Sequence, residues 1–210
     1  MSAGRLNDWL RRVPLWAVYS VGLLPAPLLV YLGATGGLGV EPIKALEHEL
    51  GELALKLLVL GLAITPLRRL TGLNLIRFRR AVGLLAFYYV CCHLLVWLVL
   101  DVQMPAEIWA DIVKRPYVTI GMAGFVLMVP LALTSNDRAL RRMGPVAWRR
   151  LHRLVYAAAL LGGLHFVIQA KTLQIEPLAY LAVIAGLLAL RLPGRRRAAA
   201  SRGRTETGLP

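Results

Sequence analysis

The side chains best suited to chemistry in this sequence are its four histidines, all within or at the ends of apolar stretches. Ionisable groups are costly in such surroundings, so each histidine is a candidate functional residue. His93 and His165 lie 12 and 14 residues past Ala81 and Leu151, where their apolar stretches begin. At about 1.5 Å per helical residue, both lie about 18 to 21 Å from that end, so the two imidazoles are predicted at similar depth.

Two imidazoles that face each other from neighbouring helices can provide both axial ligands of a b-type haem. The sequence therefore predicts a haem between His93 and His165. No CxxCH motif occurs, which excludes covalent c-type attachment, and no Cys or carboxylate spacing completes a tetrahedral zinc site. Gly162 and Gly163, just before His165, are expected to let the flat macrocycle approach the helix backbone.

His152 raises the question of a second haem. It lies 13 residues before His165, which is about 20 Å along a helix and on a different helix face. The stretch that contains His93 has no histidine at the matching depth, so a second haem would need another axial ligand. A second haem and an unligated histidine at the membrane interface both stay open.

His48, Glu52 and Lys56 recur every four residues and therefore share one face of a helix. One interpretation is an ion pair between Glu52 and Lys56 that faces the bundle, with His48 at the water interface. The other interpretation is that His48 or Lys56 contacts a haem propionate.

These residues must be positioned by membrane helices, because the 210-residue chain is 58% hydrophobic and has a mean hydropathy of +0.61. Six apolar runs are long enough to cross a bilayer as helices, and Pro25 and Pro27 should kink the first. The runs are residues 14–33, 48–67, 81–100, 117–134, 151–170 and 175–192. The predicted fold is all-α, a six-transmembrane-helix bundle with haem between its third and fifth helices.

The net charge of +14 is explained by membrane topology and not by nucleic-acid binding, because the basic residues form short clusters between apolar runs. The Arg-rich segments, residues 5–12, 68–80, 138–153 and 191–204, fall on one side of a six-span chain. By the positive-inside rule that side and both termini are cytoplasmic.

The predicted organisation has three parts. Residues 1–13 are expected to form a cytoplasmic arm, and residues 14–192 to form the transmembrane domain. Residues 193–210 are expected to be a disordered, basic cytoplasmic tail. About 20 residues follow the last span, so a fused flavin and nicotinamide domain is not expected. A membrane reductase that carries its own flavin and nicotinamide domain is therefore disfavoured.

Six stretches carry a resemblance to a known family: GGLGVEPIKALEH (36–48), ALKLLVLGLAITPL (54–67), LIRFRRAVGL (75–84), RPYVTIG (115–121), AWRRLHRLVY (147–156) and GGLHF (162–166). In order and spacing they resemble the MsrQ/YedZ family, the haem-binding membrane subunits of the periplasmic methionine sulfoxide reductase system, within the ferric reductase-like transmembrane superfamily. By position, His93, His152 and His165 resemble the family's haem-linked histidines. His48 matches a histidine in the family's second span.

The resemblance implies a b-haem protein that accepts electrons on the cytoplasmic side, from the quinone pool or a flavin reductase. The implied recipient is a soluble periplasmic molybdopterin subunit that repairs oxidised methionines in proteins. The chain would then be an electron-transfer subunit of an oxidoreductase complex rather than a self-contained catalyst.

Family members are also described as using FMN. Arg77, Arg79 and Arg80 could hold its phosphate or lie on the quinone side, although a solvated, topology-setting role is more common for such arginines. A rival function is a small proton-coupled transporter without haem, in which the histidines and the polar stripe form an ion path.

Overall fold

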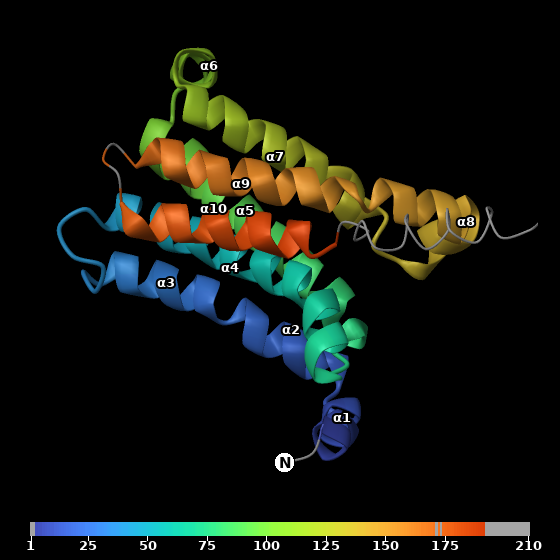
Figure 1. Cartoon of the computed structure of the whole chain (residues 1–210). Coiled ribbons are helices and arrows are strands. Elements are labelled where there is room, and N and C mark those ends of the chain that lie inside the picture. The colour runs from blue at the N-terminus through green and yellow to red at the C-terminus, as the bar shows by residue number, and fades with distance from the viewer. Residues whose placement is uncertain (1–2, 171, 173, 192–210) are drawn as a thin grey trace, which may run out of the picture.

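The computed structural model describes residues 3–170, 172 and 174–191, and every regular element among them is a helix. The α-helices are α1 (Ala3–Arg12), α2 (Leu15–Leu23), α3 (Pro25–Ala34), α4 (Pro42–Thr71), α5 (Arg79–Val96), α6 (Pro105–Lys114), α7 (Pro116–Leu133), α8 (Asp137–Leu151), α9 (Leu154–Gln169) and α10 (Ile175–Ala189). A 3₁₀ turn, Ile76–Phe78, precedes α5, and a π-helical segment, Trp97–Val102, follows it. Figure 1 shows the long helices lying side by side as one bundle.

Four helical stretches are long and apolar enough to cross a membrane: Leu15–Ala34, Pro42–Thr71, Ile76–Val102 and Pro116–Leu133. A fifth is added if α8 and α9, which are bent by 42° at a short break, form one span. α10 is apolar but shorter. The described residues therefore contain four or five spans by length and composition, with a helix at each of the six predicted runs.

Several helix ends differ from the prediction because capping residues override the apolar pattern. α4 begins at Pro42 instead of residue 48, since proline at a first helical position loses no hydrogen bond. It ends at Thr71 and is capped by Gly72, whose φ of 76° suits a residue without a side chain. The first run is interrupted at Leu24, next to Pro25, as expected. α6 was not predicted; it is a short amphipathic helix in the connection before α7.

The fifth predicted run also begins later than expected. α8 continues to Leu151, and the chain then turns through His152 and Arg153 before α9 begins at Leu154. His152 therefore lies in the joint between two helices that are bent by 42° relative to each other. The predicted tail, residues 193–210, lies outside the described residues.

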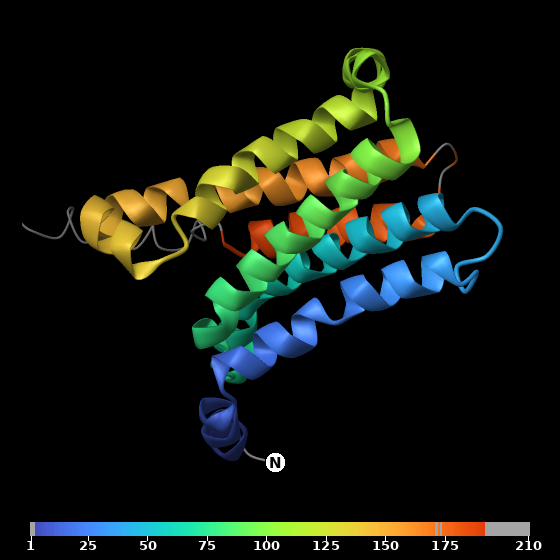
Figure 2. The same ribbon diagram turned by 180° about the vertical axis from the view of Figure 1, so that it is seen from behind.

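The centre of the bundle consists of two helix pairs, α4 with α5 and α7 with α9. Figure 2 shows both pairs from behind. One buried cluster takes one residue from each of these four helices: Leu58, Ala86, Met128 and Ala158. Ala86 and Ala158 are 0% and 1% exposed, and such small residues let helix backbones approach closely. A second buried cluster joins α4 and α9 to α10.

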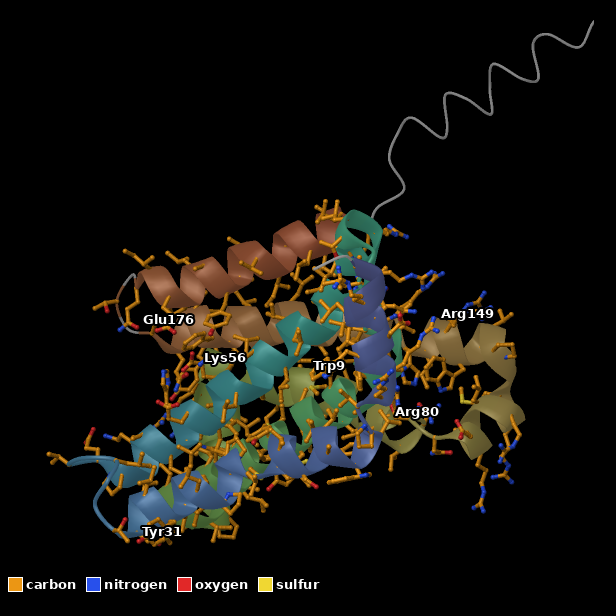
Figure 3. All side chains as sticks on the ribbon, turned by 90° about the horizontal axis from the view of Figure 1, so that it is seen from below. Trp9, Tyr31, Lys56, Arg80, Arg149 and Glu176 are labelled. Carbon is orange, nitrogen blue, oxygen red and sulfur yellow. The ribbon has the colours of Figure 1, made fainter. Side chains whose placement is uncertain are left out.

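The charged segments lie at opposite ends of the bundle. α1, α8 and the start of α5 lie at one end, whereas α6 and the connection between α3 and α4 lie at the other (Figures 1 and 2). Figure 3 shows Arg80 and Arg149 toward the first end and Lys56 and Glu176 toward the second. The folded chain thus has the basic end that the positive-inside rule requires.

Candidate functional site

The structure brings together His93 from α5 and His165 from α9. Their ring centroids lie 6.2 Å apart, and the ring planes are 82° from parallel. The two residues are 72 positions apart in the chain, so their approach depends on the packing of the two helix pairs against each other. The helices that carry them run in the same direction, as the figures show (Figures 1 and 2).

Each of these imidazoles is held by a backbone carbonyl of the helix packed beside it. Nδ1 of His93 lies 2.8 Å from the carbonyl oxygen of Glu47 on α4, and Nδ1 of His165 lies 2.7 Å from that of Tyr117 on α7. Because a carbonyl only accepts hydrogen bonds, Nδ1 carries the proton in each ring and Nε2 keeps its lone pair. Metal-bound histidines are typically oriented in this way.

The separation of the two rings fits two axial ligands of one iron. With a metal–nitrogen bond of about 2.0 Å and about 1.1 Å from nitrogen to ring centroid, two such imidazoles have centroids about 6.2 Å apart. The centroids of His93 and His165 are 6.2 Å apart. A zinc site would need further ligands, and the described residues contain no group of three or more metal-ligating side chains. The pair therefore suits haem better than zinc.

The polar face of α4 contains the ion pair expected from the sequence. Nζ of Lys56 lies 2.7 Å from Oε1 of Glu52, and the hydroxyl of Tyr180 on α10 donates to the same oxygen at 3.0 Å. The Glu52 side chain is only 12% exposed, so these partners stabilise its buried charge. His48 is exposed, and its ring lies 5.4 Å from that of Phe166. A propionate contact by His48 or Lys56 stays a prediction.

His152 has partners of its own at the basic end. Its ring stacks on Trp148, with centroids 3.7 Å apart and planes 23° apart. Its Nε2 lies 3.1 Å from Oγ1 of Thr134, whose carbonyl accepts a hydrogen bond of 2.8 Å from the Trp148 indole. These contacts tie the joint between α8 and α9 to the end of α7. They favour the interpretation of His152 as an unligated interfacial histidine.

The three arginines considered for a phosphate have different surroundings. Arg77 donates to the backbone carbonyl of Arg11, which fastens α1 to the turn before α5. Arg80 forms an ion pair of 2.8 Å with Asp137 at the start of α8. Arg79 is exposed and forms no ion pair within the described part of the chain. Two of the three are therefore used to join helices.

Gly162 and Gly163 lie against neighbouring helices in the structure. A Cβ on Gly162 would meet Leu55 of α4 at 3.5 Å, and one on Gly163 would meet Leu181 and Ile184 of α10 at 3.1 Å. Both glycines therefore permit close packing of α9 against its neighbours. The approach of a macrocycle to these glycines stays a prediction.

The fold and the paired imidazoles define a class: a multi-pass helical membrane protein that holds two histidine rings close together between its helices. Residues 50–163, just over half of the chain, match the family described as ferric reductase like transmembrane component. The chain belongs to this family and, within it, to the MsrQ/YedZ group, as the next comparisons show. The resemblance found in the sequence is thus confirmed.

Three similar proteins are named protein-methionine-sulfoxide reductase heme-binding subunit MsrQ. The Agrobacterium fabrum protein is 50% identical over 179 residues, covering 85% of this chain and 83% of the relative. The Brucella anthropi protein is 46% identical over 206 residues, covering 96% of this chain and 91% of the relative. The Brucella ovis protein is 49% identical over 179 residues, covering 85% of this chain and 81% of the relative. No solved structure matches the chain significantly.

Proposed function

We propose that this chain is a haem b-containing electron-transfer subunit with His93 and His165 as the axial ligands. The observation that carries the proposal is the 6.2 Å separation of the two rings, each with Nδ1 on a carbonyl. The relatives' name, heme-binding subunit, supports it. When bound, haem supplies one-electron chemistry at its iron, while the chain provides ligands, burial and orientation.

The proposed topology has six spans with both termini in the cytoplasm of a bacterial cell. The basic end formed by α1, α8 and the start of α5 supports this orientation in the inner membrane. His165 is then 11 residues into α9, about 16 Å from its cytoplasmic end, and the histidine pair lies in the outer half. An outer site is well placed to deliver electrons to a periplasmic partner.

The proposed partners lie on the two sides of the membrane. Electrons enter from the quinone pool or a flavin reductase at the cytoplasmic side and leave to a molybdopterin methionine sulfoxide reductase that repairs oxidised proteins. The relatives' name places them in a protein-methionine-sulfoxide reductase. Reduction of a sulfoxide to a thioether consumes two electrons and two protons and releases water, so this chain must deliver an electron twice per turnover.

Two finer assignments belong to the same proposal. Arg79 is the best candidate for an FMN phosphate or a quinone at the inner end, because Arg77 and Arg80 already have protein partners. His152 would serve a second haem only by giving up its contacts with Thr134 and Trp148.

The decisive experiment is a reduced-minus-oxidised visible spectrum of the detergent-purified protein, with haem counted as the pyridine haemochrome. We expect a low-spin b-type spectrum and one haem per chain. Two haems per chain would assign His152 to a second site. A colourless protein that is folded and was expressed with haem available would refute the proposal and favour the proton-coupled transporter.

A further inference from the structure

The helix that holds His93 in place has a glycine beside the imidazole. Gly51 follows Glu47 by four residues on α4, so it lies on the same helix face, one turn further on. A Cβ built on Gly51 would lie 3.0 Å from Nδ1 of His93 and 3.3 Å from its Cε1. Atoms that are not bonded to each other do not normally approach so closely, so a side chain at this position would push the imidazole away.

The helix that holds His165 repeats this arrangement. Gly121 follows Tyr117 by four residues on α7, and a Cβ built on it would lie 2.8 Å from Nδ1 of His165 and 3.0 Å from its Cε1. At both sites the nearest atoms belong to the histidine ring. Gly124, one turn further along α7, differs, because its nearest contacts are Leu161 and backbone atoms of α9.

We propose that Gly51 and Gly121 are positioning residues for the two axial histidines. Each leaves the space in which an imidazole edge lies against the helix, beside the carbonyl that accepts its Nδ1 proton. This contact sets the hydrogen bond of 2.7 or 2.8 Å and thereby the direction of Nε2. The inference rests on the proposed function, because the direction of Nε2 matters only if it binds iron.

An alanine at either position should displace the imidazole and lengthen its bond to the carbonyl. Partners in the second coordination shell typically contribute about 10- to 100-fold to metal affinity, so haem affinity should fall by a factor in this range. A weaker hydrogen bond at Nδ1 makes Nε2 a poorer donor to ferric iron, so the reduction potential should rise. Gly121→Ala should have the larger effect, because its contact is 2.8 Å rather than 3.0 Å.

The test compares Gly51→Ala and Gly121→Ala with two matched controls, Gly83→Ala on α5 and Gly186→Ala on α10. A Cβ at either control position would meet nothing within 4 Å. Haem per chain, reduction potential and the ferric EPR spectrum are measured on each variant in detergent. We expect changes in the first two variants and none in the controls. Unchanged values in Gly51→Ala and Gly121→Ala would overturn the inference, whereas an unaltered chain that binds no haem would refute the proposed function instead.

A double substitution keeps the inference testable if Gly121→Ala destabilises the fold. Without the His165 imidazole there is no ring for the new methyl group to meet, so Gly121→Ala should not lower the unfolding temperature of the His165→Ala protein. A loss of stability that persists in that background would identify Gly121 as an ordinary packing glycine and overturn the proposal.

Discussion

Removal of either imidazole proposed as an axial ligand should abolish haem binding while leaving the helices folded. The carbonyls of Glu47 and Tyr117, which accept from the two imidazoles, also accept the helical hydrogen bond from the N–H four residues further on. Neither His93→Ala nor His165→Ala therefore leaves a buried carbonyl without a hydrogen-bond donor. Loss of a second-shell partner alone reduces metal affinity by about 10- to 100-fold. Loss of the whole ligand should therefore exceed about 100-fold, which corresponds to about 2.8 kcal/mol.

The assay is titration of the apoprotein with haem in detergent, followed by a haemochrome count and a visible spectrum. His48→Ala is the matched control, because that ring is exposed and lies against Phe166 rather than in the pair. We expect the control to bind one haem with an unchanged low-spin spectrum, because both proposed ligands are still present. Normal haem content and a low-spin spectrum in either His93→Ala or His165→Ala would refute the assignment of the ligands.

Three further outcomes follow from the geometry. Imidazole planes 82° apart predict a highly anisotropic low-spin EPR signal in the oxidised protein, and a rhombic signal typical of parallel planes would contradict this angle. Tyr180→Phe removes the hydrogen bond from the tyrosine hydroxyl to the Glu52 carboxylate, which should contribute about 1.5–3 kcal/mol. The thermal unfolding midpoint should therefore fall, and an unchanged midpoint would show that this bond adds no stability. The new methyl group of Gly22→Ala would overlap the Leu85 side chain, so this variant should be destabilised by about 1–3 kcal/mol. Gly186→Ala is the control, and equal unfolding temperatures for the two variants would exclude this effect.

The apolar pattern and the depth of the histidines predicted much of this arrangement. A segment that crosses the lipid bilayer must be a long apolar helix, so each of the six runs could be located from the sequence alone. Counting residues from the span ends put His93 and His165 at similar depth, and the structure has them 6.2 Å apart. The ion pair of Glu52 and Lys56 followed from their spacing by one helical turn.

Other features had weaker signals in the sequence. α6 is short and amphipathic, and its Pro105 at the first helical position was its only clear signal. The joint before α9 is held by contacts of His152 with Thr134 and Trp148, which residue spacing does not reveal, so the spacing placed His152 in a helix. The partners of His93 and His165 are backbone carbonyls, which residues of any type provide, so no motif could reveal them.

The two halves of the site repeat one arrangement that the sequence conceals. In each half, one helix offers a carbonyl, a glycine one turn later leaves room, and the histidine of the helix packed beside it donates to that carbonyl. The histidines follow their carbonyls by 46 and 48 residues, a near-equal spacing. The arrangement needs only a glycine and a histidine to recur in the sequence, because the backbone carbonyls of Glu47 and Tyr117 serve equally as acceptors. For this reason the sequence shows no internal repeat of useful length. Each helix pair supplies one ligand, so haem binding should require α4 and α5 to be docked against α7 and α9.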